Sequence, residues 1–254
     1  MTNEPEASAE HFVANILPLY YGPSVKIQVQ PSNKEFIISK ELLCTESSVF
    51  SKMFNGEFLE SQQQTVTLEE TEDDTSVRSL EALIQWLYHR TVRFDIKEST
   101  MHISATMELT RLADKYDIIG LEKTMAQYIR DILKCNPHPK SFKCARNIDH
   151  NTYHLTHDHI ASANLLPRKH LVRRVLAAAS VEGFLRGPNH KFSEEILDYP
   201  SFGADLLQGI RAVLNNKESL LAYDFEDPIS GERSKLNPKV NWWLDSDDLP
   251  LPRR

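Results

Sequence analysis

Cysteine and glycine are scarce in this sequence of 254 residues. Its three cysteines, Cys44, Cys135 and Cys144, are too few and too scattered for a disulfide framework, which predicts an intracellular location in the cytoplasm or the nucleus. Its eight glycines form no phosphate-binding loop, and the hydrolase motifs G-x-S-x-G and H-E-x-x-H are absent from the sequence. We therefore expect a protein that is not an enzyme, with no catalytic residues and no cofactor.

An excess of positive charge is also lacking. The 29 Lys and Arg residues face 36 Asp and Glu residues, which gives a formal net charge of -7. This balance disfavours binding to nucleic acid or to an acidic membrane surface, because both depend on clustered Lys and Arg. The first ten residues contain three glutamates and no Lys or Arg, unlike a secretory signal. No apolar run approaches the roughly 20 residues that span a bilayer. We expect neither nucleic acid nor a membrane as a partner.

Alternating apolar residues predict strands in the first half of the chain. Val25, Ile27 and Val29 alternate with Lys26 and Gln28, which is the period of a half-buried strand. The turn-rich stretch that follows leads to a partner strand. This partner strand is expected at residues 36–38, and two further strands are expected at residues 65–68 and 91–94.

Helical periodicity follows the strands and dominates the rest of the chain. Ser47 or Ser48 is expected to cap a short helix that ends at Asn55-Gly56, and Gly120 is expected to turn a corner between two longer helices. A short apolar helix is also expected near the N-terminus and should end at Pro18. The apolar positions of the other helices fall within residues 77–88, 107–116, 121–132, 171–179 and 202–214.

Several blocks of residues resemble the BTB/POZ family. Residues 47–54, Ser-Ser-Val-Phe-Ser-Lys-Met-Phe, are similar to its "S-x-x-F-x-x-M-F" helix. Residues 109–116, Leu-Thr-Arg-Leu-Ala-Asp-Lys-Tyr, are close to its "L-x-x-A-D-K-Y" block. The resemblance covers about residues 22–135 and implies an α+β fold, the BTB/POZ fold, in which a small β-sheet is capped by a cluster of α-helices. An α-helical C-terminal region should follow, similar to that of small fungal BTB proteins.

The expected domain organisation follows from this resemblance and from changes in composition. A boundary is expected at residues 136–139, where Asn-Pro-His-Pro stops a helix. The expected parts are a partly disordered N-terminal segment at 1–21, the BTB/POZ domain at 22–135, a linker at 136–152, a helical region at 153–223 and a Pro/Asp-rich tail at 224–254.

The resemblance implies a protein–protein interaction module and one candidate partner-binding site. Phe58, Leu59 and Glu60 stand where members that recruit a cullin ubiquitin-ligase scaffold carry hydrophobic-x-Glu. The hydrophobic residue would dock into the cullin and the glutamate would stabilise the loop; alternatively, Phe58 packs under the loop and Glu60 is solvated. The function is then that of a cullin adaptor that also self-associates as a homodimer. The alternative is a transcription-associated scaffold or co-regulator without direct DNA binding.

One polar pair typical of the family is missing. Many members carry a buried Asp and His where this chain has Ser24 and Ser39. Two serines are expected to hydrogen-bond there without burying a charge, so the fold should tolerate the change.

Two further groups of residues are candidates for binding. His150, His154, His157 and His159 follow Cys135 and Cys144, but their spacing matches no zinc finger, and we expect no metal site. Trp242-Trp243-Leu244 lies among aspartates near the C-terminus. It could be a docking peptide for a partner or a clamp onto the helical region, and the clamp is favoured.

Overall fold

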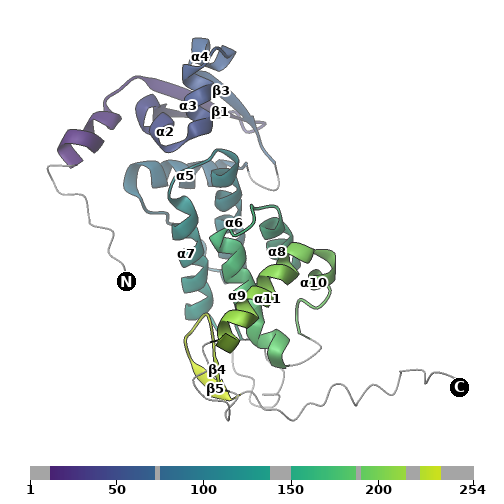
Figure 1. Cartoon of the computed structure of the whole chain (residues 1–254). Helices are drawn as coiled ribbons and strands as arrows, with labels where there is room; N and C mark the ends of the chain where they lie inside the picture. Colours follow the sequence, from purple (N-terminus) through teal and green to yellow (C-terminus); the bar gives the residue numbers. More distant parts are fainter. Residues whose placement is uncertain (1–11, 72–74, 138–149, 187–189, 216–223, 236–254) are drawn as a thin grey trace, which may run out of the picture. The chain divides into compact units, whose positions relative to one another are not determined.

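The computed structural model describes residues 12–71, 75–137, 150–186, 190–215 and 224–235 (Figure 1). The chain divides into two compact units, Met1–Met125 and Ala126–Arg254, and each is described by itself. Several sequence predictions concern residues outside the described ranges. They are the disorder of residues 1–10, Cys144, most of the linker and Trp242-Trp243-Leu244.

The first unit contains a three-stranded sheet in the order β2-β1-β3. Strand β1 (Ser24–Gln30) is central, and the alternation predicted for it is confirmed, because Val25, Ile27 and Val29 are all buried. Strand β2 (Lys34–Ser39) pairs with it antiparallel, and β3 (Thr65–Glu69) pairs with it parallel. A parallel pair needs a crossover connection, and three short helices between β2 and β3 supply it.

Serines fix the ends of these crossover helices. The Ser39 hydroxyl accepts a hydrogen bond from the Leu42 amide and caps α2 (Lys40–Glu46). Ser47 is extended and caps α3 (Ser48–Asn55) by accepting from the Phe50 amide at 3.0 Å, as predicted. The third helix is α4 (Leu59–Gln63).

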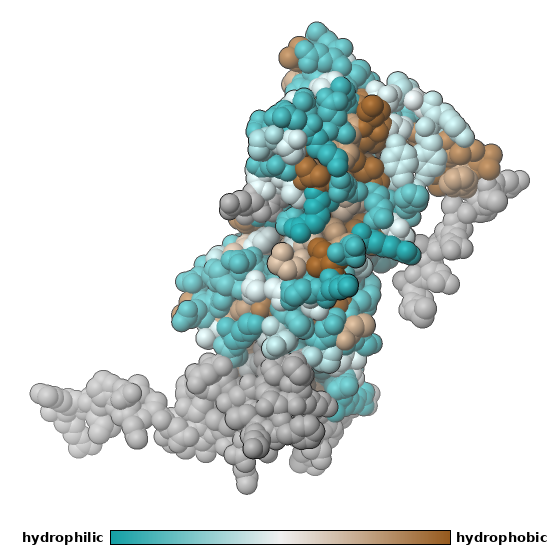
Figure 2. Space-filling view, turned by 180° about the vertical axis from the view of Figure 1, so that it is seen from behind, coloured by the Kyte–Doolittle hydropathy of each residue, from teal (hydrophilic) through white to brown (hydrophobic). Residues whose placement is uncertain are grey.

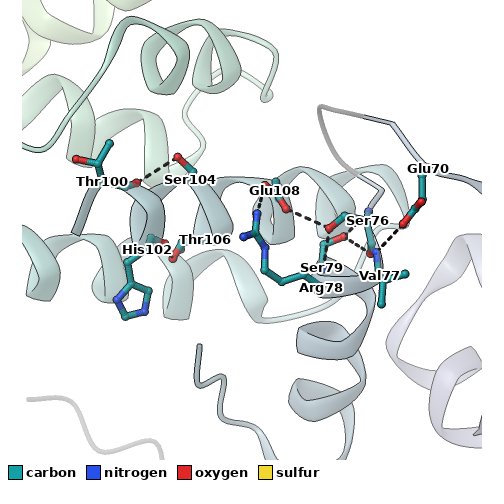
Figure 3. Close-up of polar contacts among 10 residues, drawn as sticks. All are labelled: Glu70, Ser76, Val77, Arg78, Ser79, Thr100, His102, Ser104, Thr106 and Glu108. Atoms are coloured by element: carbon teal, nitrogen blue, oxygen red, sulfur yellow. Dashed lines mark hydrogen bonds and ion pairs between the residues drawn. The ribbon is translucent and has the colours of Figure 1, made fainter. Parts of the chain in front are cut away.

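Longer helices follow the sheet: α5 (Val77–His89), α6 (Ser99–Lys115) and α7 (Leu121–Cys135). A polar network ties the start of α5 to α6 (Figure 3). Ser76 caps α5, and the Glu108 carboxylate on α6 accepts from the Ser76 hydroxyl at 3.1 Å and pairs with Arg78. The Val77 amide donates to Glu70 just beyond β3, at 3.3 Å. The predicted corner between α6 and α7 is confirmed, since Gly120 has a φ of 80°.

Two details of the prediction for this unit are wrong. Thr91–Phe94 forms no strand, because Val92 is buried and the Arg93 amide donates to the side-chain oxygen of Gln85 at 2.7 Å instead of to a neighbouring strand. The N-terminal helix does not end at Pro18. It consists of two short segments, here called the N-terminal turns: the π-helical η1 (Phe12–Ile16) and the 3-10 helix η2 (Leu17–Tyr20). Pro18 lies in the first turn of η2, where its missing amide costs no hydrogen bond.

The second unit is mainly helical, as expected for the C-terminal region. Helix α11 (Pro200–Asn215) packs against α9 (Leu171–Arg186), and Gly209 allows the close approach, because a Cβ there would lie 3.0 Å from the side chain of Val181. Val181, Leu206, Ile210 and Phe225 form a buried cluster between these helices and a small hairpin. Its elements are α8 (His157–Asn164), α9 (Leu171–Arg186), α10 (Glu195–Asp198), α11 (Pro200–Asn215), β4 (Asp224–Glu226) and β5 (Arg233–Lys235).

Candidate protein-binding surface

The candidate partner site begins at a tight turn after α3. The Gly56 amide donates to the Lys52 carbonyl and ends the helix. A Cβ at Gly56 would lie 2.4 Å from that carbonyl oxygen and 3.2 Å from the Phe58 ring. No larger residue fits there without moving the backbone, so the turn that presents Phe58 depends on glycine.

The turn places two neighbouring apolar side chains in solvent. Phe58 is 59% exposed and Leu59 is 61% exposed, so Phe58 does not pack under the loop. Glu60 is half-buried and lies in the first turn of α4, where a carboxylate is favourable because unpaired amides give this end of a helix a partial positive charge. The predicted loop is therefore a short helix that begins at Leu59.

The far side of this short helix is held to the sheet. Gln64 adopts a left-handed conformation with a φ of 50°, and its side-chain amide donates to the carbonyls of Phe54 and Ser61. Its own carbonyl accepts from the Lys26 amide on β1 at 2.9 Å. The Lys40 ammonium group also donates to the Phe54 carbonyl, at 3.0 Å. These bonds fix the position of the exposed pair relative to α3 and β1.

A third exposed apolar residue lies beside the other end of α3. Ser47 pairs in an antiparallel bridge with Ile118, and the Ser48 hydroxyl donates to Asp117. The next residue, Ile119, donates its amide to the Glu46 carbonyl at 3.0 Å and is 63% exposed. The sequence prediction missed Ile119, because its place beside α3 follows only from the bridge between Ser47 and Ile118, which are far apart in the sequence.

A separate apolar area lies at the N-terminal turns and the β1–β2 hairpin. Figure 2 shows apolar surface at the N-terminal turns. Tyr20 stacks on Tyr88 with ring centroids 5.5 Å apart, which holds the turns in place. The exposed residues are Phe12, Val13, Tyr21 and Ile37, at 40%, 58%, 79% and 73%.

The predicted serine pair does not form a buried hydrogen-bonded unit. Ser24 and Ser39 are paired across the two strands, but Ser24 is exposed. The Ser39 hydroxyl donates to the carbonyl of Leu19, and the Ser39 amide donates to the Tyr88 hydroxyl at 3.0 Å. The polar pocket is thus replaced by a bond that holds the N-terminal turns.

Two of the histidines considered as zinc ligands, His157 and His159, have separate structural contacts. His159 completes the N-terminal cap of α8 by accepting from the Thr156 amide at 3.0 Å. His157 contacts the Glu195 carboxylate at 3.2 Å and the Tyr199 hydroxyl at 3.3 Å. Among the residues that the structure describes, no three His, Cys, Asp or Glu side chains are grouped as metal ligands.

Two titratable groups of interest are shifted by burial. Desolvation lowers the pKa of His190, and the nearby Glu195 carboxylate raises it in part. Desolvation also raises the pKa of the Cys44 thiol, opposed by Lys40 and Asn55. Cys44 is half-buried and its thiol donates to the Phe50 carbonyl, so it is a poor nucleophile near neutral pH.

Helices long and apolar enough to cross a membrane do not occur in the described ranges of the chain.

Comparison with known proteins agrees with this geometry. No curated protein matches the chain. The family model of the BTB/POZ domain matches residues 24–133, which include the sheet, the crossover helices and nearly all of α5 to α7. This part of the chain, with additional helices after it, has the α+β fold that the sequence predicts. Residues 24–133 are a BTB/POZ domain, a protein–protein interaction module.

Proposed function

We propose that the protein is an adaptor that binds a cullin-type scaffold through Phe58 and Leu59 and presents a target bound to its helical region. One observation carries the proposal: two adjacent apolar side chains, each about three-fifths exposed, stand on a turn fixed by hydrogen bonds. In this proposal the interaction domain comprises residues 22–135 and the target-binding region residues 153–223.

The physical case rests on the free energy that a complex gains when a partner buries these exposed apolar side chains. Burying a Phe or Leu side chain stabilises a complex by about 1.5–3 kcal/mol each. Interfaces concentrate their energy in a few such side chains surrounded by polar residues. Glu57 and Glu60 flank the pair, and Ile119 at the other end of α3 would extend the apolar contact. Because the turn is already ordered, little conformational entropy would be lost on binding.

The test is a calorimetric titration of the full chain with a purified cullin scaffold. Phe58→Ala should weaken binding about 30-fold, which corresponds to a loss of about 2 kcal/mol at an interface hot spot. Met101→Ala is the matched control, since Met101 is 50% exposed on α6 and belongs to neither of the two apolar areas described above. Circular dichroism should show the same fold for both variants.

Equal cullin affinity of Phe58→Ala and the unchanged protein would remove this turn from the proposal. The scaffold or co-regulator alternative would instead be favoured by two results together: the protein has no affinity for cullin, and it captures transcription regulators equally well with and without Phe58→Ala.

Self-association is the second part of the proposal. The exposed residues of η1 and β2, together with Tyr21, form an apolar area that a second copy could cover. Light scattering should report a dimer for the full chain and a monomer for Ile37→Lys, because a buried lysine without a partner is costly. Phe58→Lys, with the same change of charge at a different surface, should remain dimeric. A monomeric unchanged protein at high concentration would contradict the proposal.

A further inference from the structure

The outer side of α11 carries an apolar strip that the fold leaves uncovered. Leu207 is 64% exposed and Leu214 is 43% exposed, while Leu206 and Ile210 on the adjoining side are buried. Arg211 lies between the two leucines in sequence and is also exposed. The spacing of four and three residues places Leu207, Arg211 and Leu214 on one face of the helix.

The charge within this strip is unbalanced. Among the residues described by the structure, Arg211 forms no ion pair. A guanidinium group between two exposed leucines suits a ligand that combines large apolar side chains with carboxylates. A segment of that composition occurs in the same chain: Trp242-Trp243-Leu244 is followed by Asp245, Asp247 and Asp248.

The chain reaches the strip from close by. Strand β5 ends at Lys235, and its partner β4 places Phe225 in the buried cluster with Leu206 and Ile210 of α11 (Figure 1). Trp242 follows Lys235 by seven residues, which can extend about 23 Å. A helix with its side chains is about 10–12 Å across, so this length is enough to pass around α11. Being tethered also raises the effective concentration of the segment at the strip.

We propose that Trp242-Trp243-Leu244 binds the strip formed by Leu207, Arg211 and Leu214, with the following aspartates paired to Arg211. The contact is intramolecular, and it makes the tail a built-in competitor for any target that binds this face of the helical region. It does not depend on the cullin proposal, since the strip and the tail segment both belong to residues 126–254, whereas Phe58 and Leu59 belong to residues 1–125.

The test measures tryptophan fluorescence in the full chain. The chain has three tryptophans, and subtracting the spectrum of a Trp242→Phe/Trp243→Phe variant removes the contribution of buried Trp86. The difference spectrum should be shifted to shorter wavelength, and acrylamide should quench it several-fold less than in the unfolded protein. A spectrum and quenching equal to those of the unfolded protein would overturn the proposal.

Variants then locate the contact. Leu207→Ser/Leu214→Ser should raise the quenching constant several-fold, whereas Leu165→Ser/Leu197→Ser, which changes two other exposed leucines of the same unit (62% and 79% exposed), should not. Both pairs lie in solvent, so circular dichroism should be unchanged. Protection that survives in the first variant would place the segment elsewhere and refute the strip. Protection that depends on protein concentration would mean that the tail of a second copy is bound, which also refutes an intramolecular contact.

A charge reversal tests the role of the arginine. Arg211→Asp should raise the quenching constant, and replacing Asp245, Asp247 and Asp248 by Arg in the same chain should restore protection. Failure of this restoration would refute the ion pairing between the tail and Arg211.

Discussion

Phe50→Ala should lower the free energy of unfolding by about 3–5 kcal/mol, the usual cost of deleting a buried phenylalanine. Phe50 has no exposed surface, and its ring stacks on Tyr116 with centroids 4.5 Å apart and on Phe54 at 6.1 Å. The substitution removes the ring from between α3 and the end of α6, so both burial and aromatic stacking are lost. Urea unfolding followed by circular dichroism measures the change.

Phe58→Ala is the matched control for this prediction. It removes the same side chain a few residues away, but from a position that is 59% exposed. Its effect on the free energy of unfolding should stay within about 0.5 kcal/mol. If Phe50→Ala and Phe58→Ala lowered the free energy of unfolding by similar amounts, the difference in burial between the two rings would be contradicted.

Asp205→Ala in the second unit should cost about 3–5 kcal/mol, because it leaves a buried cation without its counter-ion. Arg173 on α9 is 5% exposed, and its Nε donates to Asp205 on α11 at 2.8 Å. A second guanidinium nitrogen donates to the Leu166 carbonyl at 3.0 Å. Removing only the carboxylate therefore strands the charge at the contact between helices.

The double variant Arg173→Met/Asp205→Ala separates this cause from simple loss of packing. Replacing both members of a buried pair with apolar side chains is often close to neutral, so much of the lost stability should return. Glu35→Ala, which breaks the exposed Lys26–Glu35 pair at 3.0 Å, should change stability by less than about 1 kcal/mol. A double variant as unstable as Asp205→Ala would argue against an unpaired charge as the cause.

The elements of the BTB/POZ domain were predictable because local and tertiary preferences agree there. The alternation of Val25, Ile27 and Val29 favours a half-buried strand, and a serine at position 47 or 48, before an apolar helical pattern, favours the start of a helix. Thr91–Phe94 has the residues of a strand, yet its Arg93 amide donates to the side chain of Gln85, and no paired strand is formed there within the described part of the chain. The strand propensity of a residue reflects how well it packs against neighbouring strands, and the sequence alone does not show whether such strands are present.

The C-terminal unit was harder to predict for a similar reason. Its hairpin has strands of three residues, and a buried Asp227 that accepts from both Asn151 and the Ile229 amide holds the turn. Helix α8 has eight residues, and its cap Thr156 is completed by a histidine, His159, whose ring accepts from the Thr156 amide. Elements this short gain their stability from contacts far along the chain, so no window of sequence reveals them.

The sequence nominates the residues of the candidate site but does not describe their conformation. The motif located Phe58, Leu59 and Glu60, but exposure of a phenylalanine depends on the turn that precedes it. The close contact of Gly56 with the Lys52 carbonyl sets that turn. Ile119 carries no motif and joins the surface only through the pairing of Ser47 with Ile118.

The parallel pairing of β1 with β3 has a consequence for how such a surface can change over evolution. The segment from α2 to α4 is a crossover whose two ends are fixed by strands, while its interior carries the exposed pair. Closing a longer loop is inexpensive, since doubling its length costs only about 0.6 kcal/mol. Insertions after Asn55 would therefore spare the sheet while moving Phe58 relative to α3. If Phe58 contacts a partner as proposed, such insertions would change partner preference at little cost to folding.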